Sequence, residues 1–201
     1  MNISVYTGSI VDAAVGAHAV INASNPAVAL GSGVSAALRE ACGGNAFQRE
    51  VRERLEEEFD ADLGVDECLV TSAGSCTAFR WVLHVPAVDY RKPDPETGGP
   101  SGSRRVAACT RSALEDAVSL ASENGLAGQF VLAAPLLGAG AGGLGAVASL
   151  DAMMASIREH LSGSATDQRS VLAKLVFVVL QASDSRLVEL AATKHGLRLA
   201  S

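Results

Sequence analysis

Aromatic side chains are scarce in this chain, at 4% of its 201 residues. Hydrophobic residues still make up 48% of the sequence, so a sizeable core must be built from Ala, Val and Leu. Basic residues are also few: the chain has 16 Lys and Arg and 22 Asp and Glu, which gives a formal net charge of −6. This balance argues against general nucleic-acid binding, which needs many Lys and Arg contacts to phosphate. It does not exclude a small anionic ligand, since backbone N–H groups can hold phosphate without cationic side chains.

The sequence also lacks the patterns of a membrane span, a signal peptide or a zinc site. The apolar stretch 126–150 is broken by glycines and Pro135, which predicts a strand, a loop and a helix start instead of a membrane span. The first residues predict a strand and lack the charged segment of a signal peptide. We therefore expect a cytoplasmic protein with no membrane association, no metal and no cofactor. The cysteines match no zinc spacing and are expected to be reduced and mostly buried: Cys42, Cys68, Cys76 and Cys109.

Strand and helix patterns alternate along the chain, which predicts one α/β domain over residues 1–201 with a mostly parallel or mixed sheet. We expect this domain to be a monomer. Strands are predicted at 2–6, 19–22, 67–72, 80–85, 129–134 and 171–180. Helices are predicted at 34–41, 45–59, 104–123 and 147–161, and from a cap at Ser183 or Asp184 to about 195, with Asn45 and Ser103 as further caps. Segments 92–103 and 162–168 are predicted to be loops, the first flexible and the second polar.

Two glycine-rich loops stand out, at 22–34 and 135–145, and each follows a predicted strand and opens a helix. Glycine lets backbone N–H groups approach a ligand closely, and a helix N-terminus adds unpaired donors and a positive dipole end. Two such loops in one small domain favour a diphosphate held between opposing walls. The alternative interpretation is a pair of tight connections without a ligand. Neither loop completes a P-loop or a dinucleotide fingerprint, so another kind of nucleotide-binding domain is the weaker hypothesis.

Four segments taken together resemble the macro domain, an ADP-ribose-binding α/β module. They are GSI at 8–10, AVINASN at 19–25, GSGV at 31–34 and APLLGAG at 134–140. The resemblance implies a three-layer α/β/α fold around a mixed sheet of about six strands. It also implies a cleft for ADP-ribose, either free or attached to a macromolecule.

The resemblance also implies roles for individual residues. Asn25 would hydrogen-bond the distal ribose, Ile10 would pack against adenine, and Ser9 stands where the family has an acid that reads adenine. Asp12 is the nearby alternative acid, although a cap or turn role suits it equally well. The family's aromatic cover over the distal ribose falls near Gly142, and Tyr90 is the candidate to replace it. The other implied ligand-binding residues are Asn22, Gly31, Ser32, Gly33, Val34, Pro135, Leu137, Gly138, Ala139, Gly140, Ala141 and Gly142.

Catalytic side chains are harder to find. Hydrolytic members of one macro-domain subgroup carry Asp where this chain has Ser35, which we expect to cap the following helix, and residues 26–30 contain no Lys. ADP-ribose binding is therefore favoured, with an ADP-ribosyl hydrolase or an O-acetyl-ADP-ribose deacetylase as the alternative. The weak catalytic candidates are Asn25, Asp89 and His84. For Asp89 we favour a solvated loop acid, and for His84 a hydrogen-bonded histidine at the core edge.

Overall fold

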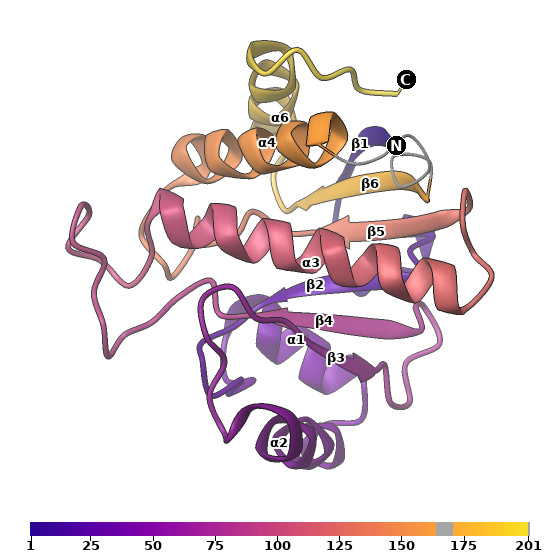
Figure 1. The fold of residues 1–201 in the computed structure, drawn as a ribbon, viewed down its shortest axis with the longest axis vertical. Coiled ribbons are helices and arrows are strands. Elements are labelled where there is room, and N and C mark those ends of the chain that lie inside the picture. Colours follow the sequence, from indigo (N-terminus) through magenta and orange to yellow (C-terminus); the bar gives the residue numbers. More distant parts are fainter. Residues whose placement is uncertain (164–170, 201) are drawn as a thin grey trace.

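The computed structural model describes residues 1–163 and 171–200, and within them six strands form a single sheet (Figure 1). The order of the strands is β1-β6-β5-β2-β4-β3. All neighbouring strands are parallel except β3, which runs antiparallel to β4. The strands are β1 (Asn2–Thr7), β2 (Ala19–Ala23), β3 (Leu69–Ser72), β4 (Trp81–Val85), β5 (Phe130–Ala134) and β6 (Leu172–Val179).

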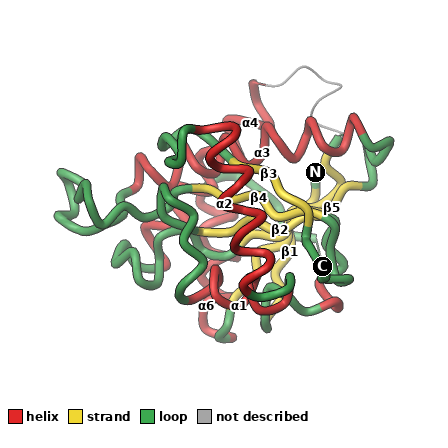
Figure 2. Tube along the Cα trace, turned by 90° about the horizontal axis from the view of Figure 1, so that it is seen from below, coloured by secondary structure: helices red, strands yellow, loops and turns green. Residues whose placement is uncertain are grey.

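Helices cover both faces of this sheet, so the domain has the three α/β/α layers that the sequence predicts (Figure 2). One face packs against α3 (Ser103–Glu123), α4 (Ala146–Gly163) and α6 (Ala182–Lys194). The other packs against α1 (Gly33–Ala41) and α2 (Asn45–Phe59). A short 3₁₀ helix, Ala13–Val15, joins β1 to β2.

The strands are apolar almost throughout because both of their faces are buried. Successive side chains of a strand point to opposite faces. In β2, Ile21 therefore joins the core under α3 and α4, while Val20 joins the core under α1 and α2. In β4, Leu83 and Val82 divide in the same way. The two hydrophobic clusters thus follow directly from the period of two in these short strands.

Several helix starts differ from the prediction by one to three residues. Asn45 and Ser103 are the first residues of their helices, and the glycines before them, Gly44 and Gly102, occupy the cap positions without any side-chain hydrogen bond. The last helix begins after Gln181, ahead of the predicted cap at 183 or 184. The propensity of Asn, Ser and Asp for the cap position was overridden by glycines at two of these starts.

Other predictions can be compared only in part. Of the predicted loop 162–168, residues 162 and 163 belong to α4, and the remainder lies outside the described residues. The four cysteines are free, and all except the half-buried Cys76 are buried, as predicted. Burial raises the pKa of the Cys109 thiol to about 12. None of the described helices combines the length and apolar composition needed to cross a bilayer.

The fold positions the two glycine-rich loops side by side. β2 and β5 are parallel neighbours, so both end at the same edge of the sheet, where ligands bind in open α/β sheets. Only two residue pairs join β2 to β5, and the last is Val20 with Ala133, although β2 continues to Ala23. The strands therefore separate before they end, and their loops leave on either side of the gap.

Candidate functional site

A cavity of about 300 Å³ lies between the two glycine-rich loops at this edge of the sheet. The segments around Asn25 and Ser32 form one wall, and the segment from Pro135 to Gly142 forms the other. Val88, Tyr90 and Leu180 complete the lining. No Asp, Glu, Lys, Arg or His side chain is among the described residues that line it. The residues predicted from the sequence that line this cavity are Asn25, Ser32, Gly33, Val34, Pro135, Gly138, Gly140, Ala141 and Gly142.

The first wall offers the backbone donors of a helix N-terminus. α1 begins at Gly33, whose φ of +54° suits glycine, and Ser32 precedes it in an extended conformation. The first intrahelical bond joins Ala36 N–H to the Ser32 carbonyl at 3.2 Å. The N–H groups of residues 33–35 therefore have no partner within the helix, and all three residues line the cavity.

The second wall is a pair of tight turns. Gly143 N–H donates to the Gly140 carbonyl at 2.9 Å, and Leu144 N–H donates to the Gly138 carbonyl at 3.1 Å. Within the described part of the chain, these turns leave the N–H groups of residues 140–142 without an acceptor. Residues with unpaired amides thus line the cavity on two sides, as they do in backbone anion sites.

Side chains fix the shape of the first loop. Gln48 of α2 accepts a hydrogen bond from Leu30 N–H at 2.7 Å and donates to the Val28 carbonyl at 3.2 Å. Val28 has a φ of +45°, a strained value for a β-branched residue, which these contacts hold in place. Asn25 Oδ1 accepts from Ala29 N–H at 3.1 Å, so the Nδ2 amide of Asn25 is the group left for a ligand. The sequence alone does not reveal the role of Gln48.

Asn22 and His84 lie behind the cavity wall and do not line it. They are in register on β2 and β4, both fully buried, and Asn22 Nδ2 lies 2.9 Å from His84 Nδ1. The other ring nitrogen lies 3.0 Å from Thr71 Oγ1, and Ser35 Oγ donates to Asn22 Oδ1 at 2.8 Å. The expectation that Ser35 caps α1 is wrong, because Ser32 occupies the cap position. The polar groups of Asn22 are bonded within the protein, and its contact with a ligand stays a prediction. Burial lowers the pKa of His84 to about 3, so this predicted core histidine is neutral.

Several other predicted contact residues also lie outside the lining. Ile10 is 5% exposed and packs in the core beneath α1 and α2, and its packing against adenine stays a prediction. Leu137 is fully buried in the opposite core. Asp12 caps the 3₁₀ helix and accepts a hydrogen bond from the Tyr6 hydroxyl, which lowers the pKa of its carboxyl and occupies both of its oxygens. The remaining predicted residues that do not line the cavity are Ser9, Gly31 and Ala139.

Asp89 is not the solvated acid that the sequence favours. It is 4% exposed and accepts from Arg91 N–H at 3.0 Å. The guanidinium groups of Arg105 and Arg91 lie 3.8 and 3.7 Å from its carboxylate oxygens. Asp89 lines a smaller cavity of about 160 Å³, which shares Asn25 and Tyr90 with the main one. A buried carboxylate needs such partners, and Arg105 comes from α3, beyond the reach of local sequence patterns.

Two exposed apolar side chains form walls that the sequence only partly reveals. Tyr90 is 60% exposed, and its hydroxyl donates to the Ala141 carbonyl at 3.5 Å, so it spans from the β4 loop to the second glycine-rich loop. It thereby stands at the wall that Gly142 leaves bare. Leu180, at the end of β6, is 82% exposed and was not among the predicted residues. An exposed leucine at a strand end carries no local signal of this role.

Comparison with known proteins decides the family. The macro domain family model matches residues 21–153, which include both glycine-rich loops, all of β5 and the end of β2. The chain belongs to the macro domain family.

This macro domain has relatives in Aquifex aeolicus and Aeropyrum pernix. An uncharacterized protein of Aquifex aeolicus is 30% identical over 159 residues, which are 79% of this chain and 82% of the relative. An uncharacterized protein of Aeropyrum pernix is 35% identical over 145 residues, covering 71% of this chain and 66% of the relative.

Solved macrodomains share its fold. A mutant of the Oceanobacillus iheyensis macrodomain, determined with ADPR, superimposes with a TM-score of 0.74 at 19% identity and covers 94% of this chain and 91% of its own. The Trypanosoma brucei macrodomain in complex with ADP-ribose gives a TM-score of 0.69 at 21% identity, over 95% of this chain and 69% of its own.

The second loop should tolerate a methyl group at Gly140 but not at Gly138. A Cβ at Gly138 would lie 2.3 Å from Ser101 Oγ on a backbone with φ +72°, whereas a Cβ at Gly140 meets nothing within 4 Å. We expect Gly138→Ala to lower the free energy of unfolding of the macro domain by about 2–4 kcal/mol. Gly140→Ala should change it by less than about 1 kcal/mol. Urea unfolding of both variants measures the difference, and equal effects would contradict the close contact with Ser101.

The buried His84 makes stability depend on pH. Its pKa is about 3 in the folded chain against 6.5 when unfolded, so the unfolded state takes up a proton first on acidification. The stabilising contribution of neutral His84 is complete above pH 6.5 and is lost progressively as the pH falls toward 3, at about 1.4 kcal/mol per pH unit. In His84→Gln, we expect the free energy of unfolding to fall less steeply between pH 6.5 and 4.5. The two slopes should differ by about 1.4 kcal/mol per pH unit, which corresponds to one proton taken up on unfolding. The other titratable groups are the same in both proteins, so their contributions cancel in this comparison. Parallel plots of the free energy of unfolding against pH would show that His84 does not cause the pH dependence.

Proposed function

We propose that this macro domain binds ADP-ribose, with the diphosphate between the N-terminus of α1 and residues 140–142. The observation that carries the proposal is the pair of opposed rows of unpaired backbone N–H groups across one uncharged cavity. Such donors and the α1 dipole favour an anion, and no lining carboxylate among the described residues opposes one. The ADP-ribose complex of the Trypanosoma brucei macrodomain, which has the same fold, supports this choice of anion.

The two ends of the ligand follow from the orientation of the cavity. The distal ribose would lie against Asn25, whose free Nδ2 donates to a hydroxyl, beneath the ring of Tyr90. Adenine would lie at the opposite end, beside Leu180. Ser9 belongs to this end because β1 pairs Thr7 with Val179, which immediately precedes Leu180. The Ser9 hydroxyl can accept a hydrogen bond from the adenine amino group.

Binding without hydrolysis is the version of this function that we favour. Hydrolysis of an ADP-ribosyl bond requires an activated water or another nucleophile near the distal ribose. The lining, as far as the chain is described, has no general acid or base other than the Tyr90 hydroxyl. Asp89 lines the smaller cavity that shares Asn25 and Tyr90 with this one, and two guanidinium groups lie beside its carboxylate. An ADP-ribosyl hydrolase or O-acetyl-ADP-ribose deacetylase remains the alternative, with Asp89 as its base.

We further propose that the domain acts as a cytoplasmic monomer that recognises ADP-ribose on a modified macromolecule. The cavity is open at the Tyr90 end, where 60% of that side chain is exposed, so an attached group has an exit. The net charge of −6 supports recognition through the ADP-ribose group itself, without general nucleic-acid binding.

Isothermal titration calorimetry should detect ADP-ribose binding, and AMP and ribose 5-phosphate should bind much more weakly because each lacks half of the ligand.

Gly140→Glu places a carboxylate beside the diphosphate in open space, so the affinity for ADP-ribose should fall about tenfold or more. Gly140→Gln is the matched control, with the same shape and no charge, and it should bind ADP-ribose nearly as well as the parent. If both variants lost affinity equally, the size of the side chain and not its charge would be the cause, which would argue against a diphosphate beside Gly140.

Turnover separates the two versions of the function. We expect no release of free ADP-ribose from an ADP-ribosylated protein, measured by chromatography under conditions in which calorimetry shows saturated binding. If release is seen and Asp89→Asn abolishes it while still binding ADP-ribose, the domain is a hydrolase with Asp89 in its machinery. The binding measurement in the same variant distinguishes loss of chemistry from loss of fold.

A further inference from the structure

The two edge strands of the sheet, β1 and β3, differ in what lies beside them. The outer edge of β1 is covered by the end of the chain, where Leu199 forms a bridge with Ile3 and Ala200 N–H donates to the Ile3 carbonyl at 2.7 Å. The outer edge of β3 has no strand beside it in the described residues (Figure 1). β3 has only four residues, and a short length is one way in which exposed edges are protected, but it contains neither the Lys nor the Pro that often serve the same purpose.

The backbone groups available at this edge follow from the antiparallel pairing. Ala73 N–H donates to the Arg80 carbonyl at 2.9 Å, so Ala73 faces β4. Peptide groups alternate along an antiparallel strand, so Thr71 also faces β4, while Val70 and Ser72 direct their N–H and carbonyl groups outward. A strand placed alongside could therefore pair with Val70 and Ser72.

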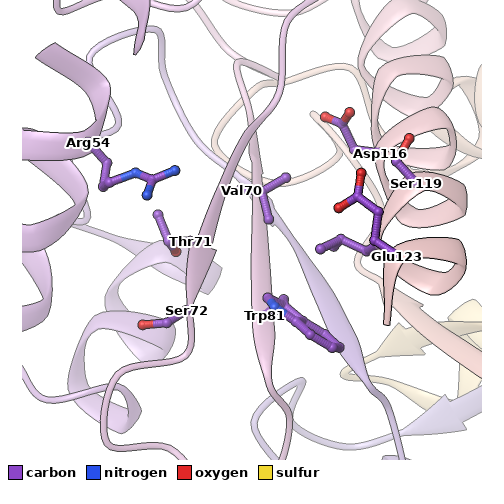
Figure 3. A pocket seen from close by; sticks show the side chains of 9 residues that line it. Arg54, Val70, Thr71, Ser72, Trp81, Asp116, Ser119 and Glu123 are labelled. Carbon is purple, nitrogen blue, oxygen red and sulfur yellow. The ribbon is translucent and has the colours of Figure 1, made fainter. Parts of the chain in front are cut away.

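A groove of about 420 Å³ runs along this edge, between α2 and α3 (Figure 3). β3 and Trp81 of β4 form its floor. Arg54 stands on the α2 side. On the α3 side, Asp116, Ser119 and Glu123 are spaced by three and four residues, so they share one face of the helix and point toward the groove.

The groove favours a cation. Its one basic side chain, Arg54, already forms an ion pair with Glu58 on the next turn of α2. Glu50 also lies at the rim, where its Oε1 accepts from Ser72 Oγ at 2.8 Å. The uncompensated charges are thus carboxylates, Asp116 and Glu123 on α3. Burial raises the pKa of Asp116, and an approaching cation would favour its ionised form.

We propose that the outer edge of β3 binds a short extended segment of a partner protein with basic residues at alternate positions. Such a segment would add as a further strand, with its backbone on Val70 and Ser72. Alternate side chains of a strand share a face and are about 6.8 Å apart. Asp116 and Glu123 are two helical turns apart, about 10.5 Å along the axis, within reach of two flexible Lys or Arg side chains. A second copy of this chain would bring the same carboxylates to the groove and is disfavoured by their repulsion.

Trp81 makes the test specific, because it is the chain's only tryptophan and lies in this groove rather than in the ADP-ribose cavity. The probe is an acetylated and amidated octapeptide of alternating Lys and Thr, and the control has Glu in place of Lys. The Lys peptide should change Trp81 fluorescence saturably and slow amide hydrogen exchange at Val70 and Ser72, and the Glu peptide should do neither. Because the readout does not involve ADP-ribose, it stands or falls independently of the proposed function.

Charge-removing variants test the contribution of α3. Asp116→Asn with Glu123→Gln should weaken binding of the Lys peptide about fivefold, and added salt should weaken it further in the parent. Glu159→Gln removes a charge from α4, outside the groove, and should leave the affinity unchanged. Equal binding of the Lys and Glu peptides, or no change at Trp81 and the two amides, would overturn the proposal. Slow exchange at Val70 and Ser72 without peptide, together with a doubled mass in solution, would assign the edge to a second copy instead.

Discussion

The early end of the pairing between β2 and β5 is the constraint on which the rest of the structure depends. Were the two strands paired to their ends, the loops after them would leave from adjacent points and close the gap. Pairing stops at Val20 and Ala133, so the loops diverge around a cavity. The turn bonds of the second loop and the N-terminus of α1 then leave backbone N–H groups facing one another. The fold thus leaves amides at the cavity that no other group of the described structure uses, and these are the donors to which we assign the diphosphate.

An anion site of this kind suits an acidic protein. With a net charge of −6, a cleft lined by carboxylates would repel a diphosphate, and one lined by lysines would require a local reversal of charge. The cavity avoids both, because its described lining has no charged side chain. Ser35 contributes to this neutrality: its hydroxyl donates to Asn22 Oδ1 and contacts the Ala23 carbonyl at 3.2 Å, so it ties α1 to β2. An Asp there would place a negative charge beside the donors that face the ligand.

The sequence predicts those features that have a local cause. Apolar runs bounded by glycines predict the order of strands and helices, and the position of both glycine-rich loops follows from it. The features it misses depend on segments distant in sequence. Asp89 is buried because Arg105 of α3 reaches it, and Leu180 becomes a wall because β6 lies next to β5. Asn22 belongs to the family-like motif, but only its pairing with His84 across β4 shows that its side chain supports the wall from behind.

The buried polar side chains behind the cavity support the helix that forms its first wall. Ser35 donates to Asn22 Oδ1, and Asn22 Nδ2 then donates to His84 Nδ1. The remaining ring nitrogen of His84 must carry the hydrogen, and it donates to Thr71 Oγ1. Each polar side chain of this network is therefore hydrogen-bonded within the protein, and a pKa of about 3 keeps His84 neutral near pH 7. The network joins α1, β2, β4 and β3 through bonds of 2.8, 2.9 and 3.0 Å, so the helix that presents its amides to the cavity is fixed to three strands of the sheet. A network satisfied in this way gives the binding helix a defined position before any ligand arrives.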